Sequence, residues 1–513
     1  MRTTLCLILG VFLPIQFFAA EITWNLNATY GVTQSGFANI ISDARTHFLS
    51  HPDDTIIVTI DEGTYNIGGN GSHGINFRPG FQPGPNGRLI FKGAGMDLTK
   101  LIFTETRQDM MNGIDVYRIT FQDMHMARPG YTVTQGTVVS IAAGELVLEI
   151  QNGFPTPLEL YDDTFAQGRY FRKYTNSTSD PQVIQEDNDQ VPWGYRNGVY
   201  LYPELVSGNT WKFYLSNPNQ ILTNYAVGDL VGVKSKHEGE IYWFNRGGEV
   251  VFENIKWTGS SRGLVRGGFS DLTIRGCRIE RGEPINGQMP CLSTPSGGPQ
   301  MNQPSDIVST NMIVENCFID SPGDDCVAFF NVNCGKVLNS TLRNSFARGF
   351  LVTPEASNIC GANNIMENNP YQIDNGQPLT EITDCGSETL NITAADSYLS
   401  NAGTLYTESA FFADIYDDPG CDIVKYINLS IETLDLENSN ENKEKRISYP
   451  NGTTGIIRFS KLLKTVSVFN TQGKEVLKIN EAKGIRTLNI SHLSSGTYFL
   501  KLDGSVIEKV IKK

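Results

Sequence analysis

A repeat between residues 312 and 352 constrains the fold more than any other feature of this sequence. Each half of the repeat contains a short apolar strand, a small polar residue, a second strand, a tight turn and a third strand. The halves superpose with a shift of 24 residues, which places Asn316 opposite Ser340. Upstream, the runs V-V-F-E-N-I-K-W and L-T-I-R-G-C-R-I repeat the first strand. This period without helical spacing predicts a β-solenoid, whose coils bury their apolar faces against one another.

The coil pattern extends over about residues 55–431. Further strands are expected at 55–65, 88–95 and 119–126, the last with Asp123 at the polar ladder position. Residues 36–49 suit a short amphipathic helix that would cover the open end of the first coil. We expect coils to resume at Ile241 and to run to about Ile431.

Two segments interrupt the coils. Residues 130–240 alternate short β-rich runs with Gly, Pro and Asn turns, which predicts a small antiparallel barrel or sandwich inserted between two coils. Residues 288–309 are rich in Pro, Gly, Ser and Gln, so we expect a loop over the cleft there.

Charge is distributed unevenly along the 513 residues. The whole chain has a formal charge of −14, but residues 446–513 contain 12 basic and 4 acidic side chains. The remaining 29 basic and 51 acidic residues give the body of the chain a charge of −22. A body this acidic argues against nucleic acid as the main partner.

Residues 1–20 have the pattern of a secretory signal peptide. A basic residue, Arg2, precedes an apolar run that ends in Phe-Ala-Ala. No later stretch approaches the roughly 18–20 apolar residues of a membrane span, so no transmembrane segment is expected. Without Cys6, eight cysteines remain, which permits disulfides in an exported chain. Cys277 and Cys317 occupy equivalent coil positions, either bonded to each other or as unpaired core residues.

The C-terminal part differs from the rest of the chain in the sign of its net charge and in its residue pattern. Residues 432–445 are polar and charged, which indicates a linker. Residues 446–513 contain V-S-V-F-N-T-Q-G-K-E-V, L-N-I-S-H-L-S-S-G-T-Y-F-L-K-L and the basic end K-V-I-K-K. This segment resembles the C-terminal sorting domain of the type IX secretion system of Bacteroidota. The resemblance implies export through the periplasm to the cell surface or exterior, with the type IX machinery as a partner.

The repeat predicts one column of side chains on the solenoid surface. Its ladder positions are Asn254, Gly276, Asn316 and Ser340. Eight residues further on stand Arg262, Pro284, Asp324 and Arg348, flanked by Glu283 and Asp325. Neighbouring coils lie about 4.7–4.9 Å apart, so this column would bring carboxylates and arginines together. Clustered carboxylates separate one another's proton affinities, which suits an acid and a base about 6.5–9.5 Å apart in an inverting glycoside hydrolase.

Several motifs resemble known carbohydrate-active families. T-I-I-V-T-I-D-E-G-T-Y and R-L-I-F-K-G-A-G resemble the first coils of the pectin-lyase-like superfamily. P-G-D-D-C-V-A-F resembles the D-D-C-I-A segment of polygalacturonases, and A-R-G-F-L-V-T-P with the insertion is similar to β-helical α-1,3-galactosidases. The resemblance implies an all-β fold: a right-handed parallel β-helix with an inserted small antiparallel barrel or sandwich and a C-terminal β-sandwich sorting domain. It also implies catalytic roles for Asp324, Asp325 and Glu283.

The chain departs from the polygalacturonase pattern at two places. Gly282-Glu283 stands where that family has Asn-x-Asp, and Ala347-Arg348-Gly349 stands where it has Gly-His-Gly. An Asp-Asp pair in a Pro-Gly turn is also common as a solvated turn, and Glu283 can be a plain surface charge.

Substrate-binding residues are expected among the charged side chains near the column. Residues 241–281 contain seven basic and four acidic side chains inside an acidic body, which suggests an anionic ligand. The alternative is that these arginines pair with nearby acids. Trp243, Trp257 and Tyr242 could stack on sugars or be buried. The candidate substrate-binding set is Arg262, Arg348, Arg266, Arg281, Asp320 and Glu280.

Three functions remain open on this sequence. The first is a hydrolase acting on an anionic (sulfated or uronic) or galactose-containing polysaccharide. The second is a polysaccharide lyase on the same fold, in which Arg or Lys abstracts a proton and acids bind Ca²⁺. The third is a non-catalytic solenoid that binds glycans. We favour the hydrolase, as a monomer without a cofactor. The six His residues show no metal-ligand spacing, and no Ser-His-Asp or phosphate-loop pattern is present.

Overall fold

The computed structural model describes most of the chain, in two compact units, 1–431 and 432–513. The described residues are 19–69, 71–105, 108–130, 133–160, 169–184, 190–234, 242–259, 265–268, 270–302, 307–369, 373–374, 377–378, 383–417, 421–432, 448–449, 455–470, 474–503 and 506–512. Residues 1–18 of the predicted signal peptide and residues 433–445 of the predicted linker 432–445 lie outside them.

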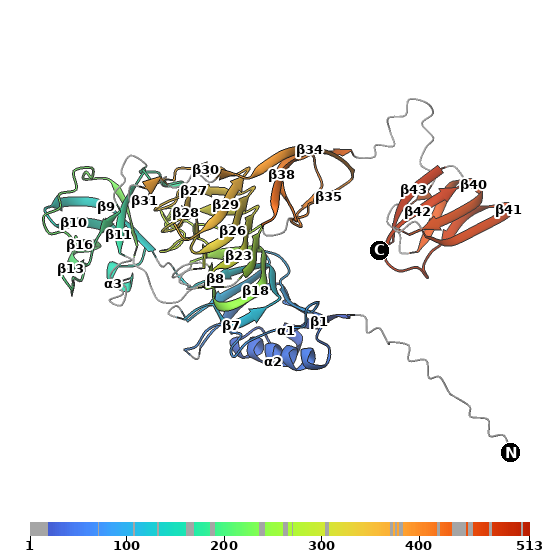
Figure 1. Cartoon of the computed structure of the whole chain (residues 1–513), viewed down its shortest axis with the longest axis horizontal. Helices are drawn as coiled ribbons and strands as arrows, with labels where there is room; N and C mark the ends of the chain where they lie inside the picture. Colours follow the sequence, from blue (N-terminus) through green and yellow to red (C-terminus); the bar gives the residue numbers. More distant parts are fainter. Residues whose placement is uncertain are drawn as a thin grey trace, which may run out of the picture. The chain divides into compact units, whose positions relative to one another are not determined.

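The first unit is a parallel β-helix, as predicted (Figure 1). Three files of strands pair in parallel from coil to coil. One file contains β1 (Glu21–Asn25), β2 (Thr55–Thr59), β5 (Arg88–Lys92), β8 (Ile119–Ala127), β18 (Tyr242–Thr258), β20 (Ser270–Arg275), β23 (Ser309–Glu315), β26 (Val332–Leu338), β29 (Ser357–Ala362) and β33 (Thr383–Asp384). The second contains β3 (Gly63–Ile67), β6 (Thr99–Phe103), the ends of β8 and β18, β21 (Arg278–Ile279), β24 (Phe318–Asp320), β27 (Thr341–Arg343) and β30 (Ile365–Glu367). The third contains β4 (Ile75–Asn76), β7 (Met111–Tyr117), the start of β18, β19 (Val265–Arg266), β22 (Gln300–Met301), β25 (Val327–Phe329) and β28 (Phe350–Val352).

A polar ladder marks the corner between the first two files. Asp123, Asn254, Gly276 and Asn316 all have positive φ, between 51° and 62°, which Asn, Asp and Gly tolerate best. Asn254 donates to Asp123 through its side chain at 3.1 Å. The predicted ladder is therefore correct over these coils, and Asp123 belongs to it.

The predicted register is wrong by one residue on the next coil. Glu315 pairs with Leu338, and Phe318 pairs with Thr341, so the shift is 23 residues. Asn316 therefore stands beside Asn339, whose φ is also 51°, and not beside Ser340. The sequence offered two adjacent small polar residues, and the left-handed corner selects the Asn.

The core is a set of in-register apolar columns inside the coils. Phe91 stacks on Phe121 with ring centroids 5.3 Å apart, and Phe121 stacks on Phe252 at 5.6 Å. All three rings are fully buried. Trp257 is buried as well, so it does not offer its ring to a sugar. The side chains of Tyr242 and Trp243 lie outside the described set.

The two ends of the β-helix differ in structure. At the first coil, α2 (Gln34–Ser50), preceded by the short α1 (Leu26–Thr29), buries apolar residues including Phe37 and Ile40 against the core, as predicted. At the other end the prediction is wrong, because coils stop at β33 instead of running to Ile431. There, β37 (Ala410–Tyr416) and β38 (Ile423–Glu432) pair antiparallel and form a sheet with β34 (Gly386–Ala395). The small pairs β31 (Ile373–Asp374) with β32 (Gln377–Pro378), and β35 (Tyr398–Leu399) with β36 (Leu405–Tyr406), complete this region.

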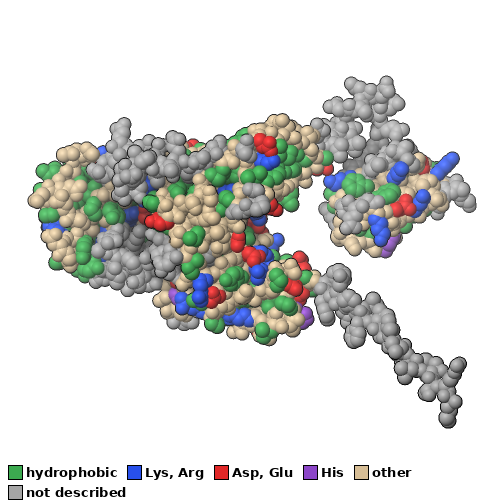
Figure 2. Space-filling model, in the orientation of Figure 1, with side chains coloured by type: hydrophobic (Ala, Val, Ile, Leu, Met, Phe, Trp, Pro, Cys, Tyr) green, Lys and Arg blue, Asp and Glu red, His purple; other side chains and the backbone are tan. Residues whose placement is uncertain are grey.

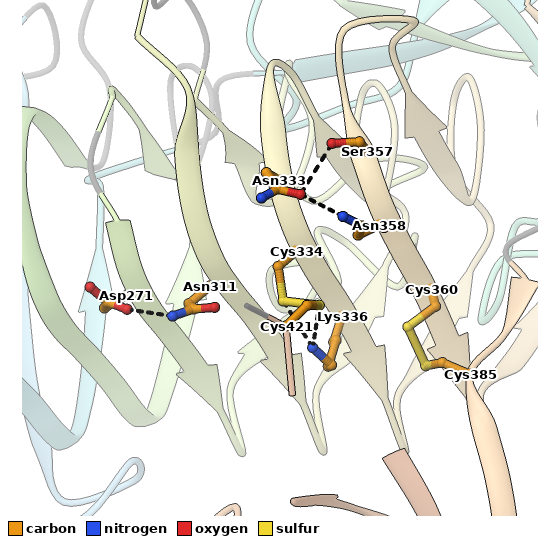
Figure 3. Close-up of a disulfide and its surroundings, with 10 residues drawn as sticks. All are labelled: Asp271, Asn311, Asn333, Cys334, Lys336, Ser357, Asn358, Cys360, Cys385 and Cys421. Atoms are coloured by element: carbon orange, nitrogen blue, oxygen red, sulfur yellow. Dashed lines mark hydrogen bonds between the residues drawn. A yellow bond between two sulfur atoms is a disulfide. The ribbon is translucent and has the colours of Figure 1, made fainter. Parts of the chain in front are cut away.

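Two disulfides join this terminal sheet region to the last coils. Cys334 bonds to Cys421, and Cys360 bonds to Cys385 (Figure 3). Cys277 and Cys317 lie in equivalent positions in the core, as expected from the repeat, but they remain unpaired thiols. Of the two alternatives for this pair, the structure has the second.

The insertion forms one antiparallel sheet that closes on itself. Its strands are β9 (Val133–Ala142), β10 (Glu145–Ile150), β11 (Tyr170–Tyr174), β12 (Val191–Pro192), β15 (Glu204–Ser207), β16 (Thr210–Tyr214) and β17 (Leu230–Lys234), with α3 (Pro157–Leu160) and the hairpin β13 (Tyr195–Arg196)–β14 (Val199–Tyr200) beside them. Beyond β12, Trp193 pairs with Leu215 directly after β16, which joins the first strand of this order to the last but one. The sheet wraps its own apolar core, so the predicted small barrel is present.

The second unit is all-β, with antiparallel pairing throughout its described strands. These are β39 (Ser448–Tyr449), β40 (Ile456–Phe469), β41 (Glu475–Asn489), β42 (Gly496–Leu502) and β43 (Val506–Lys512). Buried apolar side chains, including Val466, Val468 and Leu500, give it a core of its own.

Candidate functional site

The Asp324–Asp325 pair lies at the corner between β24 and β25. Ser321 opens the turn with a φ of 56°. Gly323 packs so closely on the preceding coil that a Cβ atom there would meet the Thr294 carbonyl oxygen at 2.4 Å. Only glycine permits this approach, because any side chain would push the turn outward. The two carboxylates therefore extend from a corner whose backbone is held against the coil beneath it.

Asp325 is a buried carboxyl group held by an arginine. It is 2% exposed, and Arg348 on the following coil donates from Nε to Asp325 Oδ1 at 2.6 Å. Burial, and then the charge of Asp324, raises the pKa of Asp325 to about 7 against the opposing effects of Arg348 and Lys234. Desolvation of the carboxylate outweighs its ion pair here, so Asp325 holds a proton over much of the range below neutral pH.

The inserted barrel completes this corner. Lys234, on β17, is 1% exposed and donates to the Gly323 carbonyl oxygen. Its ammonium group lies 4.3 Å from the ring centroid of Phe346 and 5.2 Å from that of Tyr170. Burial, and then the charge of the half-buried Asp324, raises the pKa of Tyr170. The candidate site thus includes a cation and a phenol from the barrel, which nothing in the local sequence marks as functional.

The predicted column differs from the structure on both sides of Asp324. On the following coil, Ala347 N donates to the Asp324 carbonyl oxygen, which places Arg348 beside Asp325. This is the same one-residue shift that affects the ladder. Arg348 therefore contacts the buried carboxylate and does not stand next to the half-buried one.

On the preceding coil, Ser296 stands where Pro284 was expected. Gly323 N donates to the Ser296 carbonyl oxygen at 2.8 Å, and Gly298 N donates to that of Asp325 at 3.0 Å. The reason is that residues 288–309, predicted as a loop over the cleft, contain β22 and form part of a coil. The prediction of a loop was therefore wrong, and so was the prediction that Pro284 stands beside Asp324.

Glu283 lines a separate feature of the surface. It is exposed, beside Gly282, and lines a pocket of about 230 Å³. The described residues around this pocket include Arg281 but neither Asp324 nor Asp325. A shared role for Glu283 with the aspartates remains a prediction.

Arg281 and Asp320 belong to an ion network between the barrel and the coils. Asp320, almost buried, accepts from Arg281 at 2.9 Å and from Arg343 at 3.0 Å. The same two arginines contact Asp180 of the insertion, with Arg343 at 3.2 Å. These contacts hold the barrel against β24 and β27, so both predicted binding residues position the site.

The remaining predicted binding residues are paired or outside the described set. Glu280 contacts Lys256 at 2.9 Å and Arg278 at 3.5 Å. Arg246 and Arg275 have acidic partners too, so the described arginines of residues 241–281 pair with acids, which was the alternative interpretation. Basic and acidic side chains also lie next to one another on the face of the β-helix that Figure 2 shows. Arg262 and the side chain of Arg266 lie outside the described residues.

A candidate metal-ligand group lies at the end of α2, outside this corner. His47 and His51, four residues apart on α2, and Asp54 place one ligand atom each within 4.8 Å of one another. His47 Nε2 and Asp54 Oδ2 are 2.9 Å apart and form a hydrogen bond. The i, i+4 spacing of these histidines corrects the expectation that the His residues show no metal-ligand spacing.

The C-terminal unit matches a known family. Residues 448–513 match the model described as "Secretion system C-terminal sorting domain", which confirms the sorting domain predicted from the sequence. The tail therefore marks the chain for secretion to the cell surface or exterior. A sequence search of curated proteins finds no match. Over the described residues, no helix is long and apolar enough to cross a membrane.

The comparison with solved structures finds matches of low similarity. The Agl-KA catalytic domain is 10% identical, with a TM-score of 0.31, and the match covers 72% of this chain and 52% of that one. A structure described as "Glycoside hydrolase" is 8% identical, with a TM-score of 0.26 and coverage of 70% and 98%. A pectin methylesterase in complex with a hexasaccharide is 9% identical, with a TM-score of 0.23 and coverage of 66% and 87%. This chain thus spans about half the length of the Agl-KA catalytic domain, and the fold assignment rests on the strand pairing itself.

Proposed function

We propose that the protein is a secreted polysaccharide-degrading glycoside hydrolase that uses Asp324 and Asp325 as its acid–base pair. The observation that carries this proposal is the buried Asp325, bonded to Arg348 at 2.6 Å, next to the half-buried Asp324. Two adjacent carboxyl groups in unlike environments titrate apart, which is the condition for one acid and one base at the same pH.

The two aspartates have distinct roles in this proposal. Asp325, whose pKa is about 7, donates its proton to the glycosidic oxygen as the bond to the leaving sugar breaks. Asp324 is the more exposed of the two, so it accepts a proton from the attacking water. Water attack on the opposite face of the sugar inverts the anomeric carbon. Arg348 orients Asp325 and stabilises it once the proton has left.

The barrel closes the corner over which the substrate binds. Lys234 and Tyr170 come from the insertion, and Arg172 on β11 donates to the Phe346 carbonyl oxygen at 2.7 Å. These contacts limit water access on that side, which strengthens electrostatic interactions at the carboxylates. Anionic and galactose-containing polysaccharides are the candidate substrates.

Turnover with two kinds of leaving group tests the roles. Asp324→Asn and Asp325→Asn should each lower turnover on a polysaccharide by about 10²–10⁴, the scale of general acid–base catalysis. On an aryl glycoside whose leaving group needs no protonation, Asp325→Asn should recover most of its activity, and Asp324→Asn should not. Asp271→Asn, an exposed carboxylate that accepts from Asn311 on the outer surface, is the matched control.

Product analysis separates this proposal from its alternatives. A polysaccharide lyase leaves an unsaturated uronate that absorbs in the ultraviolet, whereas a hydrolase leaves a reducing sugar of inverted configuration by NMR. A non-catalytic solenoid would bind the polysaccharide and release no product. Near-native turnover in the double variant of Asp324 and Asp325 would refute the assignment.

A further inference from the structure

A second polar feature lies on the coils that precede the aspartates. The pocket of about 230 Å³ beside Glu283 has one wall formed by β6, β8 and β18. Lys100 pairs with His125 in the strand register, and His125 pairs with Lys256. Side chains in register on adjacent parallel strands lie about 4.7–4.9 Å apart on the same face. The wall therefore presents a row of three nitrogen-bearing side chains.

Small residues leave space in front of this row. Ala127 and Thr258, two positions further along β8 and β18, and Gly259 and Gly282 also line the pocket. The Thr258 hydroxyl lies 2.7 Å from His125 Nε2. The pocket thus has room for a compact polar group within reach of hydroxyl and ammonium donors.

Lys100 is less constrained by contacts than the other lysine of this row. It is half-buried and forms no hydrogen bond or ion pair with any described residue. Lys256, by contrast, is bonded to Glu280, and Arg281 is bonded to Asp320. Among the described lining residues, Glu283 is the one carboxylate. The row of Lys100, His125 and Lys256 has an excess of positive charge, although Asp97, outside the lining, acts against it at His125.

The pKa of His125 is affected by these positive charges. Burial, and then the charges of Lys100 and Lys256, lowers the pKa of His125 to about 4 against the opposing effect of Asp97. The imidazole is therefore neutral at physiological pH and can act as a hydrogen-bond partner without adding charge. An anion in the pocket would meet the ammonium of Lys100 and the hydroxyl of Thr258.

We propose that this pocket binds the anionic substituent of the polysaccharide, a sulfate ester or a uronate carboxylate, with Lys100 as its principal cation. The inference rests on the proposed function only in taking the polysaccharide as the ligand. It assigns Lys100, His125 and Thr258, which lie on earlier coils than the aspartates, to recognition of charge. The neutral sugar ring of the same residue lies over Ala127 and the glycines.

Affinity electrophoresis of the full chain tests this subsite without requiring turnover. The gels contain a sulfated galactan, the same galactan after chemical desulfation, or polygalacturonate, at physiological ionic strength and low temperature. We expect one of the two anionic polymers to retard the protein and the desulfated galactan not to do so. Which anionic polymer retards it distinguishes sulfate from carboxylate.

The variants are Lys100→Ala and Lys100→Glu, with Lys92→Ala as the matched control. Lys92 is an exposed lysine on β5, 4.0 Å from Asp123 and outside the pocket. Lys100→Ala should weaken binding about 10- to 100-fold, the scale of one hydrogen-bonded charge, and Lys100→Glu should weaken it further. Lys92→Ala should bind like the wild type.

The outcomes separate this proposal from the hydrolase assignment. Equal binding by the wild type and both Lys100 variants would overturn the subsite, as would equal retardation in the desulfated gel or no retardation in either anionic gel. If Lys100 controls binding but no product forms, the subsite stands and the hydrolase assignment fails. If product forms only from a neutral polysaccharide, the hydrolase assignment stands and the subsite fails.

Discussion

Replacing Asp325 by Asn should change how the free energy of unfolding depends on pH. The burial of Asp325 determines the sign of this change. The pKa of Asp325 is about 7 in the folded protein, against an ordinary value of 3.8. Between these two values the folded protein holds one proton more than the unfolded chain. Stability therefore falls as pH rises through this window and is level above it. The amide of the Asp325→Asn variant cannot ionise, so the variant does not lose stability in this way as the pH rises.

The expected size follows from the same shift. A change of about 3 pKa units corresponds to about 4 kcal/mol, at about 1.4 kcal/mol for each unit. Relative to the wild type, the free energy of unfolding of Asp325→Asn should thus rise by about 4 kcal/mol between pH 4 and pH 8. Any change in the contact with Arg348 adds a constant offset, because the guanidinium keeps its charge throughout this range.

Urea unfolding followed by tryptophan fluorescence measures this difference. All five tryptophans lie in the unit that ends at residue 431, so the signal reports the β-helix unit alone. Asp324→Asn is the companion variant: it removes a charge that raises the pKa of Asp325, so its own loss of stability with pH should be smaller. Parallel pH profiles for the wild type and Asp325→Asn would show that Asp325 ionises normally and would remove the basis for its role as the acid.

Three further changes have defined outcomes. Arg348→Met removes a cation that lowers the pKa of Asp325, so the alkaline limb of the pH–rate profile should move to higher pH while turnover falls; an unmoved limb would mean that Arg348 does not act on this carboxyl group. Asp320→Asn should cost about 3–5 kcal/mol of unfolding free energy, measured in urea, because it leaves Arg281 and Arg343 without their shared buried partner, and a cost below about 1 kcal/mol would contradict the network. Deleting residues 446–513 should block export, measured by cell fractionation, and leave the specific activity of the purified remainder unchanged.

The sequence was sufficient to predict the β-helix, because its periodicity has a direct physical cause. Each coil must place apolar residues inside and a polar residue at the left-handed corner, so Asn254, Gly276 and Asn316 recur at matching positions. The same reasoning cannot choose between Asn339 and Ser340, which are adjacent and both small and polar. The choice depends on backbone conformation at one corner, and it decides whether Arg348 contacts Asp324 or Asp325.

The only part of the site that could be predicted is the part formed by consecutive residues. The Asp-Asp turn follows from Pro322-Gly323 between two short strands, whereas Lys234 and Tyr170 reach it from a separately folded barrel. Coil register was lost across residues 285–299 because that segment makes a longer path before β22. A repeat count cannot detect such an excursion, and this is why Pro284 was placed beside Asp324 in error.

The barrel and the coils act as one polar assembly, and this determines how the aspartates can work. Asp180 of the barrel contacts Arg281, which in turn is bonded to Asp320 at the end of β24. The aspartate turn begins directly after that residue, and Lys234 is bonded to its backbone at Gly323. The barrel therefore holds the turn from two sides. Burial raises the pKa of Asp325, and the charge of Lys234 on β17 acts against this rise, so the insertion takes part in setting the proton affinity on which the proposed chemistry depends.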